Sequence, residues 1–236
     1  MAGNLPHGRA RQSPVKGPVK RLTADGAEGF IRANTALSHP PHVPEIVLHL
    51  ADEAHDLWHR TEEELAGIGL PPPFWAFAWA GGQGLARYIL DHPETVSGKA
   101  VLDFASGSGL VAIAAAKAGA GSILAADIDP FAEPACRLNM AANAVTFDVT
   151  DKNLVGQTGE WDVVLAGDVF YDREMTGALV PWFEVLAANG TLILVGDPGR
   201  SYLPKTRLRE CAVYSVPVTR ALEDAEIKRT TVWQFS

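Results

Sequence analysis

The chain has 236 residues, of which 47% are hydrophobic and 20% are charged, enough for one α/β domain with additions and a full buried core. Its formal net charge is −8, and an acidic body disfavours binding to nucleic-acid phosphates and favours cationic partners. No apolar run approaches the ~18 residues of a membrane-spanning helix. We therefore expect neither a nucleic acid nor a membrane as a partner.

The first 27 residues are predicted to form a disordered basic tail. The basic residues that precede the first acid, Asp25, are Arg9, Arg11, Lys16, Lys20 and Arg21. Without these charges the remainder carries about −13. The segment lacks the apolar core of a signal peptide. Two alternatives stay open: a mitochondrial transit segment, although the prolines would interrupt its amphipathic helix, and a translation start upstream of the functional chain.

Residues 28–236 are predicted to form the folded domain, with an N-terminal extension over 28–99 and a core over 100–236. In the extension, the patterns predict an irregular segment at 30–44, a short strand at 45–50, a helix at 51–68, an aromatic loop at 70–80 and a helix at 81–92. Cys136 and Cys211 have no partner spacing, so we expect free thiols in a reducing compartment and a cytoplasmic protein.

From residue 100 onward, strand and helix patterns alternate regularly. Strands are predicted at 100–104, 122–126, 145–149, 161–167, 190–196, 211–218 and 227–235, and helices at 109–119, 130–143 and 174–188. The connection at 150–160 is short for a helical crossover, so we expect little helix there. The order predicts an α/β fold: a Rossmann-like, doubly wound sheet of seven strands that ends in an antiparallel hairpin.

The turn after the strand at 100–104 indicates a nucleoside-bearing cofactor. Asp103 ends that strand, Gly107 and Gly109 follow, and Asp127 ends the next strand, where it can accept hydrogen bonds from ribose hydroxyls. The spacing also fits an NAD site, but a carboxylate at Asp103 would repel a pyrophosphate. S-adenosylmethionine has no phosphate and carries an α-ammonium, so the pattern favours that cofactor. The alternative for Asp103 is a solvated acid at a strand end.

A second group of candidate residues follows the fourth parallel strand. Asp168 and Tyr171 come directly after it, and ligands of such sheets lie beyond the carboxyl ends of the strands. The Pro-Pro typical of enzymes that methylate planar nitrogens is missing at this place, so a carboxylate beside an aromatic ring favours an sp³ amine, whose growing positive charge a fixed anion stabilises. The alternative is that Asp168 only caps a turn.

Two further side chains are candidates for the cofactor site. Trp79 belongs to the aromatic loop, and the glycines at 81 and 82 beside it permit close approach; the alternative is that these aromatic rings form core. Asp151 follows the third strand and is a candidate partner of the adenine amine. All seven histidines lie at or before His92, which argues against hydrolase chemistry at the strand ends. We expect no metal site.

Taken together, these residues resemble a known family, the lysine methyltransferases of the electron transfer flavoprotein beta subunit, which belong to the class I, seven-β-strand methyltransferase-like proteins with an Asp/Glu-x-x-Tyr/Phe motif. The matching segments are Pro72–Trp79, Gly81–Gln83, Arg87–Tyr88, Val101–Asp103, Gly107, Gly109, Ala126–Pro130, Asn139 and Gly167–Asp172. Ala80, where Pro is frequent, and Ser108, where Cys or another small residue is usual, are the two departures from the family pattern.

The resemblance implies transfer of methyl groups from S-adenosyl-L-methionine to a lysine of a protein substrate, in which the electron transfer flavoprotein beta subunit is the candidate. It also implies that Asp103, Gly107, Gly109 and Asp127 contact the cofactor and that Asp168 to Tyr171 form the active-site motif. Two alternatives remain open: a small-amine or pyridine N-methyltransferase, and a non-catalytic cofactor-binding interaction module. We expect a monomer.

Overall fold

The computed structural model describes residues 24–51, 72–218 and 225–236. Seven strands form one sheet in the order β5-β4-β3-β6-β7-β9-β8. The first five of these are parallel, β9 runs antiparallel to β7, and β8 pairs antiparallel with β9. The strands are β3 (Ala100–Phe104), β4 (Ser122–Ala126), β5 (Asp148–Thr150), β6 (Val163–Gly167), β7 (Leu192–Asp197), β8 (Leu208–Pro217) and β9 (Ile227–Phe235). The predicted fold class and the C-terminal hairpin are confirmed.

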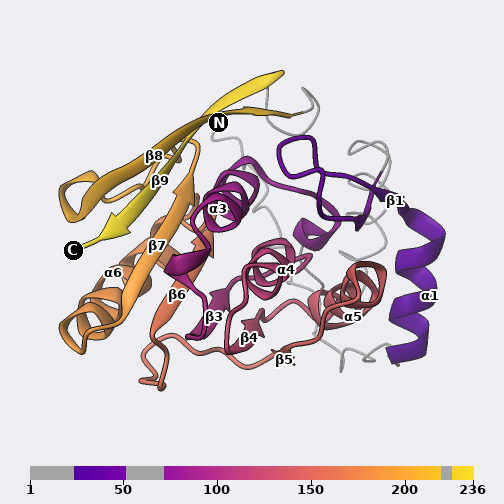
Figure 1. Ribbon diagram of the computed structural model, residues 1–236, viewed down its shortest axis with the longest axis horizontal. Coiled ribbons are helices and arrows are strands. Elements are labelled where there is room, and N and C mark those ends of the chain that lie inside the picture. Colours follow the sequence, from indigo (N-terminus) through magenta and orange to yellow (C-terminus); the bar gives the residue numbers. More distant parts are fainter. Residues whose placement is uncertain (1–23, 52–71, 219–224) are drawn as a thin grey trace, which may run out of the picture.

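Helices cover both faces of this sheet, as Figure 1 shows. The helices are α1 (Ala24–Asn34), α3 (Ala80–Asp91), α4 (Leu110–Lys117), α5 (Ala132–Asn143) and α6 (Arg173–Ala188), with short 3₁₀ turns at Phe74–Ala76, Pro93–Thr95 and Lys205–Arg207. Helices α3, α4 and α5 lie on one face, and α6 packs on the other. Within the described residues, no helix is long and apolar enough to cross a membrane.

The core follows from the alternation of side chains along the strands. In β6, Val163 and Leu165 pack with the helices of one face, whereas Val164 and Ala166 pack against α6 on the other. All four are fully buried. A strand buried on both faces is expected to be continuously apolar, which is why the sequence of β6 lacks the apolar-polar alternation of a half-exposed strand.

The N-terminal boundary of the fold differs from the prediction. Helix α1 begins at Ala24, and β1 (Ala36–Ser38) pairs antiparallel with β2 (Leu48–Leu50), so the predicted tail end at residue 27 and the irregular segment at 30–44 are wrong there. The reason is tertiary burial: Ile31 packs fully buried in a cluster with Trp75 and Leu138. Residues 1–23 and nearly all of the predicted helix at 51–68 lie outside the described residues.

Two asparagines of α5 attach the N-terminal extension to the core. The Asn139 amide accepts a hydrogen bond from the His49 backbone N–H (2.7 Å) and donates one to the Ser108 carbonyl (2.8 Å). Asn139 is fully buried, and Asn143 bonds to both the N–H and the C=O of Val47. Buried amides need such partners, so these contacts fix the extension beside the turn that holds Gly107 and Gly109.

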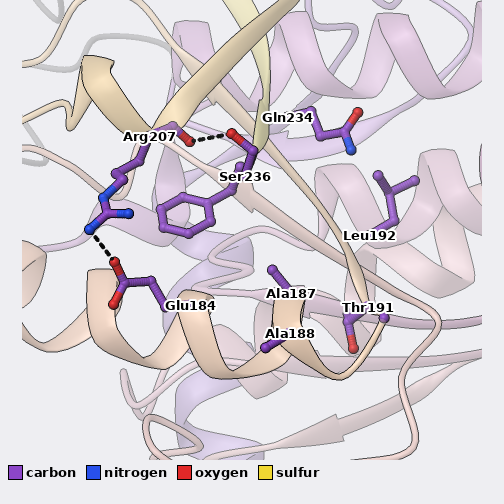
Figure 2. A pocket seen from close by; sticks show the side chains of 10 residues that line it. Glu184, Ala187, Ala188, Thr191, Leu192, Arg207, Gln234 and Ser236 are labelled. Carbon is purple, nitrogen blue, oxygen red and sulfur yellow. Dashed lines mark hydrogen bonds and ion pairs between the residues drawn. The ribbon is translucent and has the colours of Figure 1, made fainter.

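A surface pocket of about 520 Å³ lies at the opposite end of the molecule from that turn. It is lined by the end of α6, the beginning of β7 and the C-terminal residues (Figure 2). The Arg207–Glu184 ion pair (2.8 Å) forms part of its rim. Because it lies at the amino end of the parallel strands, this pocket contains none of the predicted site residues.

Candidate active site

The glycine turn after β3 is held by the acid at the end of β4. Gly107 has a φ of +51°, and its N–H donates to Asp127 Oδ2 at 2.8 Å. Asp127 Oδ1 accepts from the Asp129 N–H at 2.9 Å. A carboxylate offers about four acceptor positions, so each oxygen keeps capacity for a hydroxyl. These acceptor positions fit ribose hydroxyls, and the ribose contact of Asp127 stays a prediction.

Gly109 serves the fold of the turn itself. Its φ is +77°, a conformation that side chains other than glycine rarely adopt. A Cβ atom there would also meet the Cys136 Sγ at 2.9 Å. Gly107 also has a positive φ, but a Cβ atom there would meet nothing closer than the Trp75 Cα at 3.7 Å. Space for a ligand is therefore available beside Gly107, whereas at Gly109 the contact with α5 leaves no room for a side chain.

Asp103 lies behind the turn rather than in front of it. The residue is 1% exposed, and its Oδ2 accepts from the Ala112 N–H in the first turn of α4 at 2.8 Å. Burial raises the pKa of Asp103 to about 8, although the Ala112 hydrogen bond opposes this shift. The carboxyl group therefore connects β3 to α4 beneath the turn, so the alternative of a solvated acid is wrong, and a cofactor contact by Asp103 stays a prediction.

Three acids lie at this edge of the sheet, of which Asp103 is buried and Asp127 and Asp129 are half-buried. Besides Asp103, burial raises the pKa of Asp127, and burial followed by the charge of Asp127 raises that of Asp129 to about 7. Backbone N–H groups of Gly107 and Phe131 partly offset these shifts. A nearby cationic group favours the ionised form of such carboxyl groups, whereas a pyrophosphate disfavours it. The acids therefore fit a sulfonium cofactor better than NAD.

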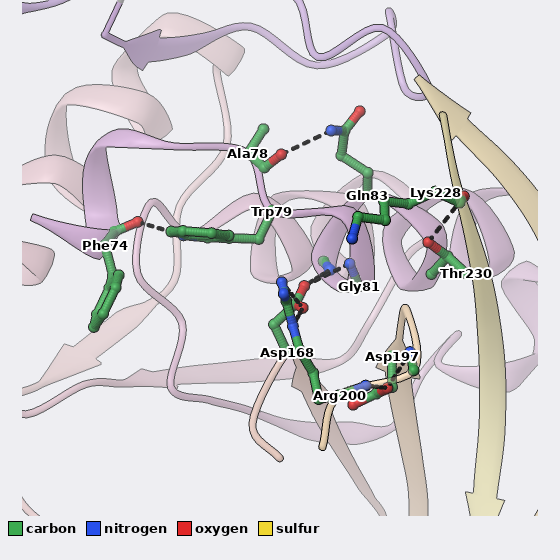
Figure 3. Close-up of polar contacts among 12 residues, drawn as sticks. Phe74, Ala78, Trp79, Gly81, Gln83, Asp168, Asp197, Arg200, Lys228 and Thr230 are labelled. Carbon is green, nitrogen blue, oxygen red and sulfur yellow. Dashed lines mark hydrogen bonds and ion pairs between the residues drawn. The ribbon is translucent and has the colours of Figure 1, made fainter. Parts of the chain in front are cut away.

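Asp168 lies at the carboxyl end of β6 with a φ of +57°, in the left-handed region that Asp tolerates better than most residues. The residue is 8% exposed. Its Oδ2 accepts from the N–H groups of Gly81 (2.5 Å) and Gly82 (3.3 Å) at the start of α3 (Figure 3). The carboxylate thus satisfies helix N–H groups that would otherwise lack partners.

The second oxygen of Asp168 binds a residue that sequence reasoning missed. Arg200 donates to Oδ1 from Nε (2.7 Å) and Nη2 (2.6 Å), and its guanidinium carbon lies 5.7 Å from the centroid of the Trp79 ring (Figure 3). Arg200 follows β7 by three residues. The rule that ligand-binding residues follow the carboxyl ends of strands could have found it.

The aromatic loop divides between core and site. Trp75 is 1% exposed and stacks on Phe131, which bears out the core interpretation for that ring. The Phe74 ring, in contrast, lies 5.6 Å from Trp79 and 5.7 Å from Tyr171, and the Trp79 indole N–H donates to the Phe74 carbonyl at 3.0 Å. Phe74, Trp79 and Tyr171 therefore form an aromatic wall beside Asp168.

The two remaining predicted residues take different places. Tyr171 is 48% exposed, and burial of its hydroxyl end, together with the charges of Asp127 and Asp172, raises its pKa above 10. Asp151 directly follows β5 and is exposed. The β5 end adjoins Asp127, since the Asp127 N–H donates to the Thr150 carbonyl at 3.1 Å. An adenine contact by Asp151 stays a prediction.

The sheet order and the site define the class of protein. Five parallel strands with an antiparallel C-terminal pair, a glycine turn after β3 and an acid after β4 make this chain a class I S-adenosylmethionine-dependent methyltransferase. A solved magnesium protoporphyrin IX methyltransferase from Synechocystis with bound S-adenosylmethionine shares the fold, at a TM-score of 0.50 and 15% identity over 66% of this chain and 78% of that one.

Comparison of sequences identifies the family. The chain is 40% identical to the electron transfer flavoprotein beta subunit lysine methyltransferase of Xenopus laevis (92% of this chain, 89% of the relative) and 35% identical to the human protein of the same name (95% and 87%). A family model described as ribosomal protein L11 methyltransferase (PrmA) matches residues 88–194. The chain belongs to the family of electron transfer flavoprotein beta subunit lysine methyltransferases.

Proposed function

We propose that this enzyme methylates a lysine side chain of a protein and that its substrate is an electron transfer flavoprotein beta subunit. The observation that carries the proposal is the similarity over about nine-tenths of the chain to enzymes of that name. The site supports it: a buried carboxylate and an aromatic wall stand at the strand edge that also holds the glycine turn. An alkyl ammonium stem suits such a wall.

The roles of the residues follow from their contacts. Asp127 accepts hydrogen bonds from the ribose, and Gly107 lets the backbone approach the cofactor, while Asp103 and Gly109 keep the turn in shape. When bound, S-adenosylmethionine supplies an electrophilic methyl carbon, to which the amine lone pair bonds as the carbon–sulfur bond breaks and sulfur keeps its electron pair. Phe74, Trp79 and Tyr171 exclude water from the lysine stem, and Asp168 lies near the positive charge that grows on nitrogen.

A labelling experiment tests the proposal. The full chain is incubated with tritiated S-adenosylmethionine and either purified electron transfer flavoprotein or cell extract, and the label is located by gel and mass spectrometry. Label on a lysine of the beta subunit is expected. Label on another protein would keep lysine methylation but change the target. Label in small molecules alone would favour a small-amine N-methyltransferase, and absence of any label would favour a cofactor-binding module without catalysis.

A further inference from the structure

The Asp168 carboxylate is surrounded by positive charge before any substrate arrives. Its Oδ2 meets two N–H groups at the N-terminus of α3, an end that carries about half a positive charge. Its Oδ1 meets the Arg200 guanidinium through two nitrogens, at 2.7 and 2.6 Å. The carboxylate at the predicted amine site is therefore already balanced, and its nearest full positive charge belongs to the protein.

This balance bears on a difficulty of lysine methylation. The nucleophile is the neutral amine, yet with a pKa near 10.4 only about one free lysine in a thousand is neutral at neutral pH. A lone carboxylate would hold the lysine as its ammonium ion and raise its pKa further. A neighbouring fixed cation lowers the pKa of the lysine, because it disfavours a second positive charge.

We propose that Arg200 is a positioning residue that neutralises Asp168, so that the site receives the target lysine as a neutral amine. The proposal rests on the proposed function. The ammonium proton leaves to water before the transfer, and the amine lone pair then attacks the methyl carbon. Arg200 touches neither the cofactor nor the reacting atoms in this scheme and acts through Asp168.

The surroundings of Arg200 hold it in this position. Its backbone N–H and that of Gly199 both donate to Asp197 Oδ1, at 2.7 and 2.6 Å, so the turn after β7 is fixed. Its guanidinium lies over the Trp79 ring, and its side chain is 21% exposed. A guanidinium stays charged at every accessible pH and presents a planar fork to a carboxylate, which suits a permanent counter-charge.

Few other titratable groups lie at this place among the described residues. Asp197 faces the turn from the end of β7, and Tyr171 and Asp172 follow Asp168 on its own loop. Asp172 caps α6 through the Met175 N–H at 2.8 Å, and the hydroxyl of Tyr171, whose pKa is raised, stays neutral below pH 10. Helix α3 contributes only backbone N–H groups. Arg200 is therefore the cation that can set the charge of the amine site.

The test is the pH dependence of kcat at saturating substrate, which reports groups that titrate in the bound complex. In Arg200→Gln, the pH at which kcat reaches half its plateau is expected to rise by about one to two units. Turnover at pH 7.5 then falls about ten- to a hundredfold and recovers toward pH 9.5. Arg200→Lys keeps the charge and is expected to shift the midpoint by less than half as much. Arg207→Gln, a surface arginine paired with Glu184, serves as the control.

A double variant separates charge balance from structural support. Asp168→Asn with Arg200→Gln removes both charges, so its kcat midpoint is expected to return toward that of the wild type although turnover stays low. If Arg200→Gln lowers turnover equally at every pH, or if it raises turnover at pH 7.5, the inference is overturned. If the wild-type enzyme labels no protein at any pH, the proposed function fails and this inference fails with it.

Discussion

Two acids that follow the strands on either side of β3 differ in what they bind. Asp127 accepts hydrogen bonds from two backbone N–H groups, one from the glycine turn and one from its own loop. Asp168 accepts from the start of α3 and from Arg200. The first arrangement leaves acceptor capacity for a ribose, whereas the second occupies both oxygens. Substitution of each acid should therefore separate cofactor binding from catalysis.

Asp127→Ala is expected to weaken binding of S-adenosylmethionine by about ten- to a hundredfold, because a charge-assisted hydrogen bond of this kind contributes about 1.5–3 kcal/mol. The variant also removes the acceptor of the Gly107 N–H, so the loss of affinity should lie toward the upper end of this range. Isothermal titration gives the affinity. Asp148→Ala, an exposed acid in the adjacent strand β5, is the control. Equal affinities for wild type and Asp127→Ala would exclude the ribose contact.

Asp168→Asn is expected to lower methyl transfer by at least about a hundredfold while affinity for the cofactor stays nearly constant. An amide can satisfy only one side of this site, because its NH₂ group would face either the Gly81 N–H or the Arg200 guanidinium. The free energy of unfolding should therefore fall by about 1–3 kcal/mol as well. Turnover, titration and thermal unfolding are measured on one preparation. Turnover close to that of the wild type would leave Asp168 with only its turn-capping role.

At the scale of elements, the site depends on how closely α3 approaches the sheet. Gly81, in the first turn of α3, lies beside Gly196 of β7, and a Cβ atom on Gly196 would come closer than 3.0 Å to the Gly81 carbonyl and to Leu85 Cβ. Gly167 of β6 has a similar relation to Gly82. These glycines let the first N–H groups of α3 reach Asp168, so the small residues serve the position of the helix.

Gly196→Ala is therefore expected to push α3 away from β7 and to lower the free energy of unfolding by about 1–3 kcal/mol or more. Gly177→Ala is the matched control, because Gly177 lies inside α6 and a Cβ there would meet nothing within 4 Å. The control should raise stability by about 0.5–1 kcal/mol. Urea unfolding followed by circular dichroism measures both. A free energy of unfolding equal to that of the wild type in Gly196→Ala would show that α3 can move without loss of stability.

The sequence predicts the elements best where apolar runs are long and bounded by turns. The pattern places β3, β4 and β9 with their observed bounds. It places β5 three residues early, because Ala144 closes α5 in the left-handed conformation and Val145 still bonds to Met140. Helix α1 was not predicted, since its stability comes from Ile31 packing with distant parts of the chain, and local patterns do not contain that contact.

The sequence predicts at which strand ends the site residues lie, but not which hydrogen bonds and ion pairs they form. Asp127, Asp168 and Tyr171 follow parallel strands, so their shared edge follows from topology alone. The direction of each carboxylate does not, because it depends on donors far away in the sequence. Asp168 binds Gly81 and Arg200, which lie 87 and 32 positions away in the sequence. The Asp103 carboxyl lies beneath the glycine turn and accepts from the Ala112 N–H. These orientations required the folded structure.

At the scale of the whole molecule, the parallel strands gather acids at one edge. Asp103, Asp127 and Asp129 all have raised pKa values, and burial is the largest cause for each. The molecule as a whole carries −8. Without a ligand, the fold therefore keeps carboxyl groups at its functional edge that bind their protons more tightly than usual, and a positively charged cofactor favours their ionised forms when it binds.

The thermal stability of the protein without cofactor is expected to fall as the pH rises from 6.5 to 8.5. Asp103 has a pKa of about 8 in the folded chain and about 3.9 when unfolded. Folded protein thus binds the proton more tightly, and the stability that this gives below pH 4 is lost progressively up to about pH 8. His42 and His49, whose pKa values burial lowers, act in the opposite direction at the start of this window, because the unfolded chain still loses imidazolium protons between pH 6.5 and about 7.5.

Differential scanning calorimetry across this range measures the effect, with Asp103→Asn as the matched variant. The wild-type Tm should decrease with pH, and the variant should show a flatter profile, because its amide accepts from Ala112 without titrating. S-adenosylhomocysteine keeps the purine and ribose contacts, so it should raise Tm at every pH. Ionisation of distant acids and bases changes both proteins alike. Parallel profiles for the wild type and Asp103→Asn would therefore show that Asp103 is ionised in the folded chain throughout this range.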